Sequence, residues 1–205
     1  FVGRVEGALV AASNKMTWGG PADLEDLRVE LIVLLRHQPA IFEVHALDTD
    51  GREHLALSRV IRDRLQSGND WSRDPNFLGA RNGGKHVGQV MLRDGTEPHL
   101  MLAVGRKPDG AVLVADVNLK FVGEVIARIQ AEFAGVAYVV DGSGHLIAHP
   151  ETSVMLGRND FSRLPQVRRA TGRDFEVGSL TGTSQSLQGT PVFASAVTIP
   201  HLGWT

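Results

Sequence analysis

Cysteine is absent from this chain of 205 residues, so a thiol nucleophile, a thiolate metal site and a disulfide scaffold are all excluded. Neither sign of charge dominates, because the formal net charge is only −2, and this argues against nucleic acid as a partner. No run of about 18 apolar residues occurs and no signal peptide is recognisable, so no membrane-spanning segment is predicted within the sequence. Hydrophobic residues still make up 42%, which is enough to form real cores.

Motifs that would carry catalysis are also missing. The sequence has no GxSxG elbow and no HExxH pair, and its carboxylates are not spaced as a catalytic pair. Residues 79–86 are similar to a phosphate-binding loop, but His86 stands where Ser or Thr is required, and a strand-like run follows. We therefore predict no enzymatic activity, no cofactor and no nucleotide site for this fragment.

Histidine is the remaining source of metal ligands. His145 and His149 would share one face of a strand, but about 13 Å apart, which is too far for one ion. His45 and His54 are predicted to face each other across a four-residue hairpin loop, with their Cβ atoms about 5 Å apart. Zinc requires three or four ligands, so two exposed edge histidines are favoured over a metal site.

The most informative feature that is present is an internal repeat. Residues 41–57 consist of an apolar, β-rich run, a turn from Asp48 to Gly51, and a second apolar run. The same order recurs 93 residues later, with a turn from Asp141 to Gly144. Asp can bond its own backbone at the start of such a turn, and Gly supplies the positive φ that closes it. The pattern predicts two copies of a small sheet domain, in which Asp141 and Gly144 are structural.

Helical periodicity marks three longer segments. Apolar residues recur at steps of three and four at Val2, Val5, Leu9, Ala12 and Met16. A second helix is predicted from Pro21 to about residue 38, with acidic residues in its first turn and Arg36 and His37 in its last. A third helix is predicted at 122–133, between the two copies.

Shorter elements complete the two copies. Short helices are predicted at 58–68 and 161–170. Strand-like runs separated by turns are predicted at 87–92, 99–106, 111–119, 184–187, 191–199 and from 202 onward. With the first hairpin, the first copy would hold five short strands in an antiparallel sheet backed by helices.

Several ordered segments resemble one protein family, the double Cache sensor domains. Residues 136–150 (VAYVVDGSGHLIAHP) and 157–162 (GRNDFS) are similar to the membrane-proximal half of those domains. Similarity to the membrane-distal half is found at residues 57–59 (LSR), 68–72 (GNDWS), 77–80 (FLGA) and 114–120 (VADVNLK). The resemblance spans nearly the whole chain. It implies an α+β fold in which a long N-terminal helix is followed by two tandem PAS-like modules, each an antiparallel sheet flanked by helices.

The resemblance also implies a domain organisation and a cellular setting. A helical stalk is expected at residues 1–38, a membrane-distal ligand-binding module at 39–120 and a membrane-proximal module at 121–205. The fragment would be a periplasmic or other extracytoplasmic sensor, anchored in the inner membrane by flanking transmembrane helices. The expected parent is a histidine kinase of a two-component system, with a nucleotide cyclase or a chemoreceptor as alternatives. A soluble binding domain or a metal-dependent enzymatic domain is the alternative from another class.

A small-molecule ligand is expected in the distal module, at Arg59, Phe77, His99, Asp116 and Asn118. Asp116 lies where amino-acid-binding relatives place an aspartate that grips the ammonium group of the ligand. Residues 74–80 lack the arginine and the Trp-Tyr pair of those relatives, which argues against α-amino acids. Arg59 would replace the missing cation, and this suits a small carboxylate. The structural alternatives are an Asp116 bonded to the lid backbone and an Arg59 in a surface ion pair.

The N-terminal stripe from Val2 to Met16 has near-heptad spacing and leaves two alternatives open. Its first turns pair with the same helix of a second chain in a parallel homodimer, or the stripe packs on the distal sheet as an ordinary amphipathic helix.

Overall fold

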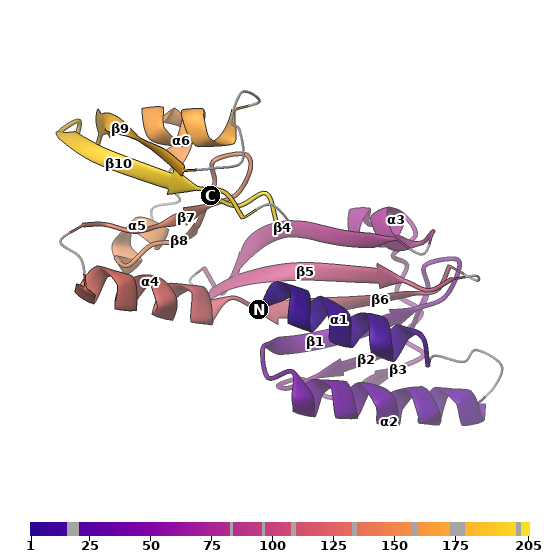
Figure 1. Cartoon of the computed structure of the whole chain (residues 1–205). Coiled ribbons are helices and arrows are strands. Elements are labelled where there is room, and N and C mark those ends of the chain that lie inside the picture. The colour runs from indigo at the N-terminus through magenta and orange to yellow at the C-terminus, as the bar shows by residue number, and fades with distance from the viewer. Residues whose placement is uncertain are drawn as a thin grey trace. The chain divides into compact units, whose positions relative to one another are not determined.

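The chain forms two compact units (Figure 1). The computed structural model describes residues 1–15, 21–82, 84–95, 97–107, 110–132, 135–156, 160–172, 179–199 and 202–205. The first unit comprises Phe1–Met91 and His99–Leu119, and the second comprises Leu92–Pro98 and Lys120–Thr205.

The first unit is an α+β structure built on a six-stranded antiparallel sheet. Its strands are β1 (Ile41–Leu47), β2 (Glu53–Ser58), β3 (Arg64–Leu65), β4 (Lys85–Arg93), β5 (Glu97–Gly105) and β6 (Val112–Asn118). The order across the sheet is β3-β2-β1-β6-β5-β4. The centre therefore joins β1 to β6, two segments that lie far apart in the sequence.

Helices cover both faces of this sheet because its central strand is apolar on both sides. Residues 112–115 of β6 are all 0% exposed, although successive side chains of a strand point to opposite faces. Val112 and Val114 pack with Phe77 and Ala80 of α3 (Pro75–Ala80). The side of the sheet that bears these residues is called the α3 face below.

Two helices contact the sheet in addition to α3. α1 (Val2–Ser13) and α2 (Pro21–His37) lie side by side (Figure 1), with α1 against β6 and α2 against β1 and β2. The α1 stripe Val2, Val5, Leu9 and Ala12 is at most 7% exposed. The structure thus decides between the two alternatives for this stripe, because these side chains pack inside the chain and cannot form a seam between chains. Met16, the last residue of the predicted stripe, lies outside the described residues.

The helix predicted at 58–68 is wrong. Arg64 and Leu65 instead form β3, pairing with Ala56 and Leu55 of β2. The Ser58 Oγ accepts hydrogen bonds from the backbone amides of Val60 and Ile61, and Gln66 N donates to a backbone carbonyl of β2. Without β3, one edge of β2 would carry unpaired backbone N–H and C=O groups. Residues 64–65 pair with these groups as a strand, whereas a helix in this segment would leave them unpaired.

The second unit contains helices and two pairs of strands. Its helices are α4 (Lys120–Glu132), α5 (Thr152–Leu156), the 3₁₀-helix η1 (Phe161–Arg163) and α6 (Pro165–Thr171). Its strand pairs are β7 (Val139–Val140) with β8 (Leu146–Ala148), and β9 (Ser179–Gln185) with β10 (Pro191–Val197). Val140, Phe161, Leu164 and Val167 form a buried cluster in this unit.

Most of the other predicted elements are confirmed. The runs at 87–92, 99–106 and 111–119 are β4, β5 and β6, and the helix at 122–133 is α4. The short helix at 161–170 is formed by η1 and α6. In the described part of the chain, every helix is too short or too polar to cross a lipid bilayer.

Candidate functional site

The first hairpin turn holds the segment that leads into α3. Asp48 Oδ1 accepts hydrogen bonds from the backbone amides of Asp50 and Arg52, both at 2.9 Å. Gly51 has a φ of +81°, and a Cβ placed there would lie 2.8 Å from Ser72 Cα. Only glycine fits this close approach. The turn therefore fixes residues 70–72, and α3 follows directly.

α3 is a short helix that begins with two local signals. Asp74 is its N-cap, with a side chain that accepts from Asn76 N, and Pro75 occupies its first turn. Phe77 is 1% exposed and packs into the cluster on the α3 face. Residues 70–80 are called the lid segment below.

A row of paired residues crosses the α3 face. Met101 of β5 pairs with Asp116 of β6, and Asp116 pairs with Glu43 of β1. Directly paired residues project to the same face, and Asp116 lies two positions beyond Val114, so the row lies on the α3 face. Gly88 of β4 continues it, since a Cβ at Gly88 would lie 3.2 Å from Met101 Cβ.

The row contains two buried carboxylates that stand directly opposite each other. Glu43 is 6% exposed and Asp116 is 8% exposed. Arg64 Nη2 donates to Glu43 Oε1 at 2.7 Å, and His99 Nδ1 donates to Asp116 Oδ1 at 2.6 Å. Each carboxylate thus has its own partner, but like charges that face each other across strands destabilise a sheet.

A third carboxylate on this face is saturated by its neighbours. His45 Nδ1 donates to Glu53 Oε2 at 2.8 Å, while Ser67 and Asn69 donate to Glu53 Oε1 at 2.6 and 3.1 Å. Burial raises the pKa of Glu53, but the His45 and Ser67 hydrogen bonds and the charges of His45 and Arg64 outweigh it and lower the pKa to about 2. Glu53 is therefore a structural anion.

The lid segment adds an acceptor that no described residue satisfies. Asn76 is 9% exposed, and its Nδ2 donates to Asp74 Oδ1 at 2.9 Å. Its Oδ1 is buried and has no hydrogen-bond partner among the described residues. A Cβ at Gly88 would lie 2.4 Å from this oxygen, so Asn76 points at the row. Leaving such an acceptor unpaired costs about 1–3 kcal/mol, which calls for an explanation.

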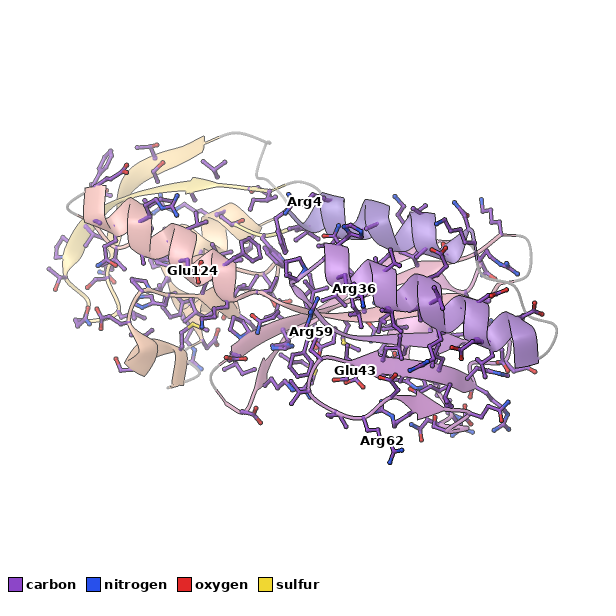
Figure 2. All side chains as sticks on the ribbon, turned by 90° about the horizontal axis from the view of Figure 1, so that it is seen from below. Arg4, Arg36, Glu43, Arg59, Arg62 and Glu124 are labelled. Atoms are coloured by element: carbon purple, nitrogen blue, oxygen red, sulfur yellow. The ribbon has the colours of Figure 1, made fainter. Side chains whose placement is uncertain are left out.

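Four of the five sequence-predicted site residues lie on the α3 face. His99 pairs with Asn118 and bonds Asp116, whereas Phe77 belongs to the apolar cluster of that face. The fifth residue, Arg59, lies beside the C-terminal end of α2, near Arg36 (Figure 2). Its guanidinium donates to the carbonyls of Leu35, Ile41 and Gln38, so the structure does not bring it to the row.

The predicted pairing of His45 with His54 is wrong. His45 pairs with Ala56, and the register of the hairpin shifts between Ala46 and Leu47. A β-bulge therefore displaces His54, whose Nε2 bonds Asp48 Oδ2 at 2.8 Å. Among the described residues, no three His, Asp or Glu side chains are placed to hold a metal ion.

Sequence reasoning missed Glu43, Arg64 and Asn76. Glu43 and His45 occupy alternate positions of an otherwise apolar strand, a signal that could have revealed polar groups on one buried face. Arg64 falls in the segment that the sequence predicts to be helical, and Asn76 carries no signal in the sequence.

The second unit repeats the turn and the lid. Asp141 Oδ1 accepts from the amides of Ser143 and His145 at 2.8 and 2.9 Å. Gly144 has a φ of +84°, and a Cβ there would lie 2.6 Å from Ser162 Cα, so its predicted structural role is confirmed. Residues 160–170 (DFSRLPQVRRA) match 70–80 (DWSRDPNFLGA), but with an offset of 90 instead of 93, which concealed the match.

The counterpart of Asn76 in the second unit is fully bonded. Gln166 Nε2 donates to Tyr138 Oη and to Gln185 O, both at 3.1 Å. Ser184 Oγ donates to Gln166 Oε1. The polar lid residue of the second unit thus finds its partners within that unit.

Comparison with solved structures identifies the fold. No protein-family model and no curated protein matches the sequence. The extracellular domain of mmHK1S-Z2, described as a histidine kinase, matches with a TM-score of 0.74 and 13% identity over 98% of this chain and 88% of its own. The ligand-binding domain of the Campylobacter jejuni chemoreceptor Tlp3, solved with 4-methylisoleucine, matches with a TM-score of 0.67 and 11% identity over 91% of this chain and 75% of its own. The ligand-binding domain of the Pseudomonas aeruginosa amino acid chemoreceptor PctC, solved with GABA, matches with a TM-score of 0.65 and 14% identity over 99% of this chain and 86% of its own.

These neighbours are extracellular ligand-binding sensor domains of the Cache type, so the resemblance to Cache domains and the α+β, PAS-like character of the fold are confirmed.

Proposed function

We propose that this chain is the extracytoplasmic sensor domain of a transmembrane receptor and that it binds a small molecule on the α3 face of its first unit. The observation that carries the proposal is the row Gly88, Met101, Asp116 and Glu43, onto which the unsatisfied Asn76 Oδ1 points. A ligand that donates a hydrogen bond to Asn76 Oδ1 would account for this buried, unpartnered acceptor.

The contrast between the two units supports the choice of the first. The first unit places Glu43, Asp116 and Asn76 on one sheet face, whereas in the second unit Gln166 is saturated by its own neighbours. We assign the ligand-binding module to residues 39–120 and a supporting module to 121–205. Each is taken as a PAS-like module, with residues 1–38 as the helical segment that precedes them.

The parent receptor is proposed to be a histidine kinase of a two-component system, anchored in the inner membrane by helices outside this fragment. Solved neighbours include both a protein described as a histidine kinase and chemoreceptors. A chemoreceptor or a nucleotide cyclase therefore remains the alternative output. A homodimeric receptor would need a surface other than the buried α1 stripe.

Thermal unfolding of the fragment with a broad panel of amines, carboxylates, amino acids and sugars tests the proposal. A ligand at 100 times its dissociation constant adds about 2.7 kcal/mol of stability, which raises the melting temperature measurably. Glu43→Gln and Asp116→Asn should weaken the response. Glu124→Gln, at an exposed position of α4 (Figure 2), is the matched control and should not change it. A response that is lost only on substitution in the second unit would overturn the assignment.

A further inference from the structure

The outward face of α2 is charged at both ends and apolar in the middle. Arg28 pairs with Asp63 at 3.1 Å on one flank of the helix, and Glu30 pairs with Lys15, just beyond α1, at 2.9 Å on the other flank. Between these flanks lie four exposed residues at steps of three, four and three, namely Asp26, Val29, Val33 and Arg36. These four residues are called the α2 stripe below.

The two valines of the α2 stripe gain nothing by burial within a single chain. Val29 is 52% exposed and Val33 is 42% exposed, whereas Leu27, Leu31 and Leu34 on the opposite side of the helix are at most 6% exposed. A β-branched residue in the middle of a helix loses side-chain freedom and is a poorer helix former than Ala, Lys or Glu. Burial of both valines against a partner would offset this cost, because apolar surface removed from water favours association.

The spacing of the α2 stripe fits a second copy of the same helix. Steps of three, four and three are those of a coiled-coil seam, in which one helix packs lengthwise against another. The stripe is also symmetric about Leu31, since Asp26 and Arg36 each lie five positions from it and Val29 and Val33 each lie two. An antiparallel second α2 centred on Leu31 therefore sets Asp26 against Arg36 of the second copy, and Val29 against Val33 of the second copy. Such a surface is complementary to itself, as a two-fold dimer requires.

The charges of the α2 stripe select the antiparallel orientation. A parallel pair would set Asp26 against Asp26 and Arg36 against Arg36, and like charges that meet across an interface oppose association. Among the described residues, neither Asp26 nor Arg36 forms a hydrogen bond or an ion pair, so both charges are available to a partner chain.

We propose that α2 forms a homodimer interface of this chain, in which two copies pack their α2 stripes antiparallel about Leu31. The α1 stripe cannot serve this purpose, because its side chains are enclosed within one chain. The α2 interface does not involve the α3 face, so it is independent of the proposed ligand site.

Sedimentation equilibrium of the 205-residue chain measures this interface directly. A single pair of helices buries less than the roughly 1,000 Å² of a stable interface, so we expect a weak dimer with a dissociation constant between about 10 µM and 1 mM. Val29→Lys and Val33→Lys place a charge in the middle of the seam, and each should weaken the dimer at least about tenfold. Because both positions are exposed in the single chain, the diluted, monomeric variants should keep the melting temperature of the monomer.

Charge reversal tests the orientation of the two copies. Asp26→Arg and Arg36→Asp each bring like charges together twice in the antiparallel dimer, so each should weaken it about tenfold. The double variant with both changes restores opposite charges, and it should dimerise as tightly as the original chain. An equimolar mixture of the two single variants should associate as a heterodimer for the same reason.

Glu124→Arg is the matched control for Asp26→Arg. It makes the same change of charge at an exposed position of α4 (Figure 2), so it should leave the dissociation constant of the dimer unchanged.

The outcomes separate this interface from the proposed function. A chain that stays monomeric up to about 1 mM overturns the interface, and so does a dimer that Val29→Lys and Val33→Lys leave intact. If the single charge variants weaken the dimer but the double variant does not recover it, the antiparallel pairing of Asp26 with Arg36 is wrong. Ligand binding is measured separately by thermal unfolding of the same chain, so none of these results decides whether the fragment is a sensor.

Discussion

The two units share one construction around the hairpin turn and use it differently. In the first unit the His45 ring lies 4.7 Å from the Trp71 ring, and in the second the Tyr138 ring lies 4.9 Å from that of Phe161. His45 and Tyr138 are 93 residues apart, as are the two turns, while Trp71 and Phe161 are equivalent lid residues. The aromatic contact between sheet and lid is thus common to both units.

The difference lies in the polar groups around that contact. Glu43 and Glu53 of the first unit correspond to Val136 and Leu146 of the second, by the same offset. The first unit therefore keeps charged groups on its sheet, whereas the second pairs Tyr138 with Gln166. The two units thus share the scaffold of the turn and lid, and they differ in whether the sheet beside it carries charged side chains.

The largest effect is expected where the two units are most alike, at the turn glycines. Gly51→Val and Gly144→Val each force a β-branched residue to a positive φ and place a Cβ 2.8 or 2.6 Å from the lid backbone. We expect each variant to lose at least about 3 kcal/mol of unfolding free energy in urea titrations. Gly95→Val is the control, because Gly95 has a φ of +76° but a Cβ there would meet nothing within 4 Å. This variant should lose only the stability that the strained backbone conformation costs. A smaller loss at Gly144 than at Gly95 would show that the second turn does not hold its lid.

The next largest effect is expected at low pH. Acid should destabilise the first unit more than the second, because Glu53 has no ionisable counterpart in the second unit. The pKa of Glu53 is about 2 in the folded chain, against an ordinary 4.5, so its stabilising contribution is present above pH 4.5 and is lost as the pH falls towards 2. The full contribution is roughly 3 kcal/mol, and it concerns the first unit alone.

Hydrogen exchange measured between pH 5 and 2 would locate this loss. Amides of β1 and β2 should lose protection before those of β7 and β8, and Glu53→Gln should abolish the difference. Simultaneous loss in both units at every pH would contradict the asymmetry.

A smaller effect is expected at Arg59, which distinguishes a structural cation from a ligand-binding one. Its guanidinium donates to three backbone carbonyls around the end of α2, so Arg59→Met should cost roughly 2 kcal/mol of stability without changing ligand affinity. Arg62→Met, at an exposed position three residues on (Figure 2), should be silent in both measurements. Loss of affinity in Arg59→Met with unchanged stability would restore the ligand role predicted from the sequence.

The smallest effect is expected at Tyr138, on the internally satisfied side of the comparison. Tyr138→Phe removes one of the three hydrogen bonds of Gln166 and keeps the ring contact with Phe161. The melting curve should shift by an amount equivalent to about 1 kcal/mol, and ligand affinity should stay the same. An effect on affinity would mean that the second unit also contributes to binding.

The sequence by itself determined the elements whose signals are local. Period-two runs bounded by turns gave β4, β5 and β6, and the three-and-four spacing gave α1, α2 and α4. The repeat from Asp48 to Gly51 and from Asp141 to Gly144 was readable because a turn is specified by its own residues. Asp116 and His99 could also be named as candidate site residues from their strand position and the family resemblance, and their ligand-binding role stays a prediction.

Only the tertiary structure shows which of these helices, strands and side chains contact one another. The spacing of the α1 stripe shows that one face of the helix is apolar. It does not show that this face packs against β6, which lies about 100 residues away in the sequence. The bulge that separates His45 from His54 and the pairing that makes 64–65 a strand both depend on the neighbouring strand. Glu43 meets Asp116 because β1 pairs with β6 in one register, and Asn76 reaches Gly88 because the turn holds the lid segment. Groups so distant along the chain are brought together by packing, and their chemistry exists only once the chain has folded.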